Sequence, residues 1–266
     1  MLKLLDRAED LFAFAETEPY WASAVAADGF AFLPNPELMN IWVEKEGEKP
    51  VAALKCDTES LVLLTKDAPP SAEMLFFIGK LLEDGLVRRI HTNPVAAAVL
   101  KNLFPLREEK RVLMACSSAL EPSFPEGLTL RENASIDELF DLFVAVLGDE
   151  DHPEKEFLEL KLRRGMAHGQ TTVFTLYDGE KAVSTAMIRG RTENSGAIAS
   201  VMTREDYRKR GCASYLTALC AGRLLEEGKT PWLIPAGETA QKLYEKLGFT
   251  ARSTYYNLFV ERETTK

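Results

Sequence analysis

The residues with the clearest chemical potential form one basic, glycine-containing stretch in the last third of the chain. It reads Arg208-Lys209-Arg210-Gly211-Cys212-Ala213-Ser214. An apolar segment at 197–202 precedes it and a helical pattern at 215–227 follows it, so a strand is predicted to enter a tight loop that opens a helix. The first N–H groups of a helix have no partner within it, and the helix dipole makes that end positive. The stretch therefore predicts a binding site for the pyrophosphate of a cofactor, and Gly211 would let the backbone approach it closely.

The composition narrows the class of protein around this loop. The chain has 266 residues, of which 46% are hydrophobic and 27% charged, with a net charge of -9. This length and composition predict one large or two small globular domains. The acidic balance argues against a nucleic-acid partner and would attract a cationic substrate such as an amine. We expect a cytoplasmic protein without a membrane partner, because no run approaches the roughly 20 apolar residues of a membrane span and the first residues lack a signal-peptide core.

The four cysteines give no sign of a metal site or of a disulfide framework. They are Cys56, Cys116, Cys212 and Cys220, widely separated and without a CxxC pair. We expect reduced thiols and no metal. Cys212 would stand at a helix N-terminus, which lowers the pKa of a thiol, but we do not assign it a role as nucleophile.

The chain divides near its middle at a segment of linker composition. Residues 117–127 hold two prolines, one glycine and three serines, which is typical of a connection between domains. We therefore predict domains at 1–116 and 128–266. The second half reads β-α-α-β-β-β-α-β-α-β-β, closing with strands at 249–251 and 255–261. The first half reads β-β-β-α-β-α-β from Ile41, with helices at 4–15 and 21–27 in front. The shared order predicts an internal repeat, as does the likeness of 93–104 to 237–249.

Helix starts in both halves carry capping residues. Ser71 and Asn93 are predicted N-caps, the second followed by Pro94, and Ser135 with Glu138 forms a capping-box pattern.

Two further segments make the basic loop resemble a known cofactor signature. Arg208-Lys209-Arg210-Gly211-Cys212-Ala213 matches the (Q/R)-x-x-G-x-(G/A) motif of the GNAT superfamily of N-acetyltransferases. The preceding residues 201–207 are similar to the family's V-x-T-x-P-x-Y approach, with Glu205 in place of proline. The later residues 243–249 resemble its L-Y-x-K-x-G-F segment. The resemblance implies an α+β fold of α/β/α layers around a mixed, splayed central sheet, arranged as two tandem GNAT-like domains.

The same resemblance implies the site residues and the co-substrate. Acetyl-CoA would enter where the sheet splays, its pantetheine arm pairing with the backbone of Val201 and Thr203. Tyr244 matches the family's frequent general acid, which reprotonates the departing thiolate; a phenol of pKa near 10 can donate at neutral pH. The implied cofactor-binding residues are Val201, Met202, Thr203, Arg208, Lys209, Arg210, Gly211, Cys212, Ala213 and Ser214.

Two departures from the family pattern leave parts of the site open. Gly237 stands where the family often has asparagine, and no pattern marks a general base. Candidates are Glu150, Asp151, His152, Glu238 or a chain of waters. The acidic turn at 149–151 is either a solvated turn or a selector of a cationic acceptor.

The first half has no counterpart of the basic loop. Residues 67–71 read Asp-Ala-Pro-Pro-Ser in the equivalent place. Prolines lack the amide donor and Asp67 would repel phosphate, so this half is predicted not to bind CoA. It could brace the second half, cover the acceptor cleft or mediate a homodimer.

Two functions follow from the sequence. The first is an acetyl-CoA-dependent N-acetyltransferase, in which a primary amine attacks the thioester directly. The second is a non-catalytic acyl-CoA-binding or regulatory protein. A nucleotide kinase is disfavoured, because neither GxxxxGK(S/T) nor GxGxxG occurs. The acceptor, whether a small amine or a peptide amine, and the acyl chain length stay open.

Overall fold

The two halves of the chain build the same succession of elements. The computed structural model describes residues 1–33, 39–57, 59–118, 120–148 and 154–261. The elements of the first half are β1 (Leu2–Leu4), the 3-10 helix η1 (Ala8–Phe14), α1 (Pro19–Phe32), β2 (Asn40–Glu46), β3 (Lys49–Asp57), β4 (Ser60–Leu64), α2 (Ala72–Glu83), β5 (Arg89–Thr92), α3 (Pro94–Leu103) and β6 (Leu106–Ala115). Those of the second half are β7 (Thr129–Glu132), α4 (Ile136–Leu147), α5 (Lys155–Ala167), β8 (Thr172–Asp178), β9 (Lys181–Arg191), β10 (Ser195–Thr203), the 3-10 turn η2 (Glu205–Tyr207), α6 (Cys212–Glu226), β11 (Thr230–Leu233), α7 (Glu238–Lys246) and β12 (Thr250–Val260). The predicted repeat of element order is confirmed.

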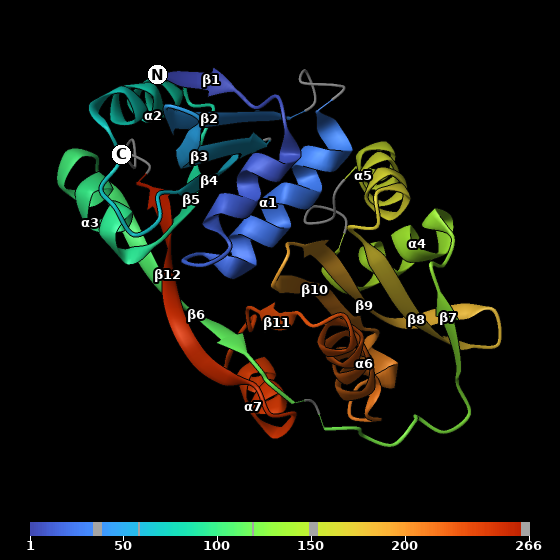
Figure 1. Cartoon of the computed structure of the whole chain (residues 1–266). Helices are drawn as coiled ribbons and strands as arrows, with labels where there is room; N and C mark the ends of the chain where they lie inside the picture. The colour runs from blue at the N-terminus through green and yellow to red at the C-terminus, as the bar shows by residue number, and fades with distance from the viewer. Residues whose placement is uncertain (34–38, 58, 119, 149–153, 262–266) are drawn as a thin grey trace, which may run out of the picture.

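One mixed sheet runs through both halves, joined by an exchange of their last strands (Figure 1). In the described residues its order is β1-β2-β3-β4-β5-β12-β6-β11-β10-β9-β8-β7. The closing strand of the first half, β6, pairs with β11 of the second, and β12 pairs with β5 of the first. The two closing strands also pair antiparallel with each other, from Thr250 opposite Ala115 to Val260 opposite Leu106. Each half therefore needs a strand of the other to complete its sheet.

Helices cover both faces of the second half's sheet. Successive residues of a strand point to opposite faces, and Phe174 packs with α6 whereas Val173 packs with α4 and α5. Helix α1 of the first half lies on the α5 side, against β9 and β10 (Figure 1). A Cβ at Gly190 in β9 would collide with the backbone carbonyl of Ser23 in α1. The absence of a side chain at Gly190 is what lets the two halves pack this closely.

The capping predictions are confirmed. The amide of Met74 donates to the Ser71 hydroxyl at 3.1 Å and that of Ala96 to the Asn93 side-chain oxygen at 3.0 Å. Ser135 and Glu138 form both bonds of a capping box.

Two predictions at the chain ends are wrong. The helix predicted over 4–15 is a short strand followed by a 3-10 helix, because Leu2 to Leu4 add to the sheet edge beside β2. The two closing strands predicted at 249–251 and 255–261 are one strand, β12, whose pairing shifts between Ala251 and Ser253. That irregularity absorbs the residues between the predicted strands, so the strand continues past it.

Two expectations from the sequence concerned the cysteines and membrane-spanning segments. All four cysteines are free thiols. Across the described ranges, no helix is long and apolar enough to cross a membrane.

Candidate functional site

The sheet of the second half opens beside the predicted loop. Strand β10 pairs with β11 only from Ser195 to Ala197, although it continues to Thr203. On its other side, the pairing with β9 is irregular between Ala199 and Met202, and Ser200 takes a positive φ of 52°. A bulge of this kind frees backbone groups from the ladder and bends the strand. The last residues of β10 therefore separate from β11, and their unpaired backbone groups face the gap between the two strands.

The loop after β10 turns amide groups outward at the start of α6. Lys209 and Gly211 have positive φ angles of 62° and 84°. The first hydrogen bond of the helix runs from the amide of Tyr215 to the Gly211 carbonyl at 2.9 Å. The amides of Cys212, Ala213 and Ser214 precede that bond and so point out of the helix end. No side chain caps this end, which leaves the donors available to a ligand.

One pocket collects most of the predicted cofactor-binding residues. Its volume is about 440 Å³. It is lined by Thr203, Tyr207, Arg208, Lys209, Gly211, Cys212, Ala213, Ser214, Thr239 and Leu243. The structure thus brings the end of β10, the loop, the first turn of α6 and one face of α7 around a single hollow.

The remaining predicted residues lie around the pocket. Val201 packs against the core under α6, whereas Met202 points to the opposite face, among side chains of α4 and α5. The Arg210 guanidinium lies over the Tyr207 ring at 4.8 Å from its centroid, outside the pocket lining. Only the backbone of Val201 and Met202 is therefore directed toward the gap beside β10.

The Cys212 thiol is turned away from the ligand side of the loop. The side chain is 2% exposed, and its Sγ lies 3.8 Å from the Tyr207 carbonyl, to which it donates. Burial raises the pKa of this thiol above its ordinary value, the reverse of the lowering that a helix N-terminus alone predicts. Only the amide of Cys212, and not its sulfur, is placed to serve the pocket.

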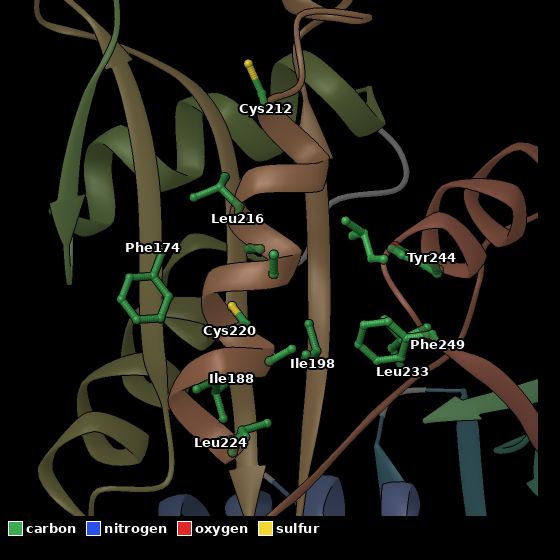
Figure 2. Close-up of a cluster of buried hydrophobic side chains, with 14 of the residues drawn as sticks. Phe174, Ile188, Ile198, Cys212, Leu216, Cys220, Leu224, Leu233, Tyr244 and Phe249 are labelled. Carbon is green, nitrogen blue, oxygen red and sulfur yellow. The ribbon is translucent and has the colours of Figure 1, made fainter. Parts of the chain in front are cut away.

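Tyr244 lies on α7 and belongs to the buried core beside α6, whereas its neighbour Leu243 lines the pocket (Figure 2). Its side chain is 6% exposed and its ring centroid lies 6.1 Å from that of Phe249, in the core that packs under α6. Burial, together with the nearby Tyr20 and Cys220, raises the pKa of the Tyr244 phenol to about 12. The hydroxyl is therefore protonated throughout the physiological pH range and is able to donate a hydrogen bond.

Of the predicted base residues, only Glu238 lies in the described part of the chain. Glu150, Asp151 and His152 lie outside the described residues. Glu238 is exposed at the start of α7 and pairs with Lys242 at 2.6 Å.

A second pocket lies on the other face of β10, and sequence reasoning missed it. Its volume is about 150 Å³, and Ser200 of the bulge lines it together with the charged residues Asp28, Lys161 and Arg189. The Asp28 carboxylate is fully buried and lies 2.6 Å from the Lys55 ammonium, 2.8 Å from the Lys161 ammonium and 3.0 Å from the Arg189 guanidinium. Burial alone would raise the pKa of Asp28, but Lys161, Lys55 and Arg189 hold it far below its usual range. The available signal was Asp28 itself, the one charged residue in an otherwise apolar helix, Pro19–Phe32.

One family model matches part of the chain. The model of the acetyltransferase (GNAT) family matches residues 136–249. A search of curated proteins found no match.

Solved structures of low sequence identity share the fold. A GCN5-related N-acetyltransferase from Kribbella flavida is 20% identical with a TM-score of 0.60, over 81% of this chain and 88% of its own. A GCN5-related N-acetyltransferase-like protein from Streptococcus suis is 17% identical with a TM-score of 0.55, over 96% and 99%. A tandem GNAT protein from the clavulanic acid biosynthesis pathway is 11% identical with a TM-score of 0.61, over the whole of both chains. The GNAT family model thus matches most of the second half, and the fold of the whole chain is similar to that of a tandem GNAT protein.

Proposed function

We propose that the protein is an acetyl-CoA-dependent N-acetyltransferase whose second half carries the active site. The observation that carries the proposal is the pocket where the separated end of β10 meets the open amides of α6. The amides of Cys212, Ala213 and Ser214 would hold the pyrophosphate, as free amides at a helix start do. Arg208 and Lys209 line the same pocket and supply positive charge.

The gap beside β10 would take the pantetheine arm. The backbone of Val201 and Thr203 would pair with its amides, where β10 has left β11. Bound in this way, acetyl-CoA would supply an acetyl thioester beside the bulge at Ser200.

The reaction needs the chain to orient two groups and to support one leaving group. A neutral amine forms a bond to the thioester carbonyl carbon, the carbon–sulfur bond breaks to release the thiolate of CoA, and the nitrogen loses a proton to water. The Tyr244 hydroxyl would donate to the departing thiolate. Because its pKa of about 12 lies above that of an ordinary thiol, near 8.5, this phenol would act mainly by hydrogen bonding, with complete proton transfer uphill.

Calorimetric titration with acetyl-CoA tests the site by comparing two glutamate variants, one at each end of helix α6. In Gly211→Glu, a carboxylate would face the pyrophosphate, and like charges in contact cost several kcal/mol. We expect affinity to fall at least about 100-fold, which corresponds to roughly 2.7 kcal/mol.

Gly228→Glu is the matched control. Gly228 follows the other end of α6, has a positive φ of 72°, and like Gly211 has open space around its Cβ position. It should carry the same backbone strain and bind acetyl-CoA as the unmodified protein does. Equal binding by both variants, or no binding by the unmodified protein, would show that the site is misassigned.

The same pocket could serve a non-catalytic acyl-CoA-binding protein. The observations that favour this alternative are the Gly237 at the start of α7, which has no side-chain cap, and the burial of Tyr244. Thiol release from acetyl-CoA in the presence of an amine library separates the two functions, because a sensor would bind acetyl-CoA and release no thiol with any amine.

A further inference from the structure

The pocket at Ser200 is built by both halves of the chain. Ala27 and Asp28 come from α1 of the first half, whereas Lys161 comes from α5 and Arg189 from β9 of the second. Phe157 adds an apolar wall and stacks on Phe32 of the first half at 5.1 Å between ring centroids. The first half therefore closes a cavity against the strand that bears the bulge.

The position of this pocket relates it to the acetyl group. Ser200 points to the side of α1 and α5, whereas its neighbour Val201 packs on the α6 side. A molecule in the pocket would reach the β10 bulge from the face opposite α6. That is the approach an acceptor needs if acetyl-CoA occupies the loop and gap on the other side.

The charges around the pocket do not balance. Three cations, Lys55, Lys161 and Arg189, face the Asp28 carboxylate, and Lys55 also pairs with Asp57 at 2.6 Å. One positive charge is left over in the described part of the chain around the pocket. Buried charges are normally paired, because removing them from water costs several kcal/mol each.

Two further observations locate the surplus charge at Arg189 and Lys161. The Arg189 guanidinium uses one terminal nitrogen on Asp28, at 3.0 Å, while its buried Nε has no hydrogen-bond partner. Burial and the neighbouring Arg189 lower the pKa of Lys161 to about 8, against the pull of Asp28. Both side chains line the pocket and remain partly exposed, at 25% for Arg189 and 19% for Lys161.

We propose that this pocket binds the carboxylate of the acetyl acceptor, so that the acceptor is a small amino acid with an apolar side chain. Arg189 and Lys161 hold the carboxylate, since a guanidinium presents paired donors that match two carboxylate oxygens. The amine is directed toward Ser200 and the apolar side chain lies against Phe157 and Phe143. The volume, about 150 Å³, matches a cavity that admits a molecule of benzene size. The inference rests on the proposed function for the identity of the acetyl donor.

The test measures binding rather than turnover. N-acetyl derivatives of glycine, alanine, valine, leucine and phenylalanine, each with a free carboxylate, are titrated by calorimetry against their C-terminal amides. Titrations are run with and without CoA. At least one free acid should bind at least about tenfold more tightly than its amide. Arg189→Gln should lose that preference, with little change in amide affinity.

Control variants separate charge recognition from folding. Arg163→Gln removes an exposed guanidinium two residues from Lys161 on the same helix and should bind as the unmodified protein does. Lys161→Gln provides a second removal of charge if Arg189→Gln does not fold, as judged by circular dichroism. Arg189→Lys keeps the charge without the paired donors and should fall between.

The outcomes are distinguishable from failure of the proposed function. If acetyl-CoA does not bind but the acids do, the acetyl donor is misassigned and the carboxylate site stands. If acetyl-CoA binds, yet no acid in the panel binds or the amides bind equally well, the carboxylate site is wrong. Loss of acid and amide affinity together in Arg189→Gln would also overturn it.

Discussion

The loops that follow β4 and β10 occupy the same place in the two halves. They differ in the hydrogen-bond partners of their backbone amides. In the first half, the amides of Thr65 and Lys66 donate to the Glu18 carboxylate at 2.8 and 3.0 Å. In the second half, the corresponding region opens into the 440 Å³ pocket. The first half thus satisfies its loop with a carboxylate of its own, whereas the second leaves donors for a ligand.

The strands before these loops also differ in how far each stays paired with its parallel neighbour. Strand β4 pairs with β5 from Ser60 to Leu63, one residue short of its end. Strand β10 leaves β11 after Ala197, six residues before its end. A repeated fold therefore does not imply a repeated site. We propose that the first half serves instead as one wall of the pocket at Ser200, which we call the acceptor pocket.

The late helices continue the contrast. Leu100 and Tyr244 both stand seven residues after their helix N-caps, Asn93 and Gly237, and both are buried. Only the second half has a hydroxyl at this position.

The largest effect is expected from removing that hydroxyl. Tyr244→Phe keeps the ring in its place beside Phe249 and should lower kcat at least about 100-fold, the usual range for loss of one hydrogen-bond donor to a charge that develops in the transition state. The readout is thiol release, with acetyl-CoA affinity by calorimetry as the control. Unchanged kcat would reduce Tyr244 to a core residue equivalent to Leu100.

A side chain at Gly190 should destabilise the packing of α1 on β9 between the two halves. In Gly190→Ala, the new methyl group would meet the Ser23 carbonyl of α1. Because backbone must move, we expect a loss of about 3 kcal/mol in the free energy of unfolding, at the upper end for overpacking. Urea unfolding measures it. Gly222→Ala in α6 has open space at its Cβ position and should be neutral or slightly stabilising; equal effects of the two changes would contradict the close packing of α1 on β9.

The buried Glu18 carboxyl group of the first half should make the free energy of unfolding depend on pH. Burial raises the pKa of Glu18 from 4.5 to about 7, against the hydrogen bonds from Thr65 and Lys66. Its folded pKa lies above its unfolded pKa, so its contribution is complete below about pH 4.5 and is lost as pH rises through 7. Glu18→Gln cannot ionise. Relative to this variant, the unmodified protein should lose at most about 3 kcal/mol between pH 4.5 and 8.

The control for that pH series is Glu16→Gln, at an exposed position two residues earlier. It should follow the unmodified protein at every pH. Parallel curves for Glu18→Gln and the unmodified protein would show that the Glu18 carboxylate is not the buried acid described above.

The smallest effect concerns pH and the acceptor pocket. Lys161, with a pKa of about 8, loses its charge above that pH, while Arg189 stays charged beside Asp28 and Lys55. The affinity of an N-acetyl amino acid, which does not itself titrate there, should fall up to about tenfold between pH 7 and 9. Its amide should show no change, and a flat profile for both would exclude a role for the Lys161 charge.

The sequence predicted the local geometry of residues 208–214 and did not predict the pocket at Ser200, for a physical reason. Residues 208–214 are contiguous, and a strand, a glycine and a helix start define their geometry locally. The acceptor pocket joins Asp28, Lys161 and Arg189 from three distant segments, which only tertiary packing brings together. The exchange of β6 and β12 was equally hidden, because strand pattern does not specify partners. The boundaries predicted at 116 and 128 stay a prediction.

The central claim is that one of two similar halves binds acetyl-CoA. The most direct test is the stoichiometry of acetyl-CoA binding to the full chain by calorimetry. One site per chain, lost in Gly211→Glu, is the predicted result. Two sites per chain, or one site that survives Gly211→Glu, would contradict the account.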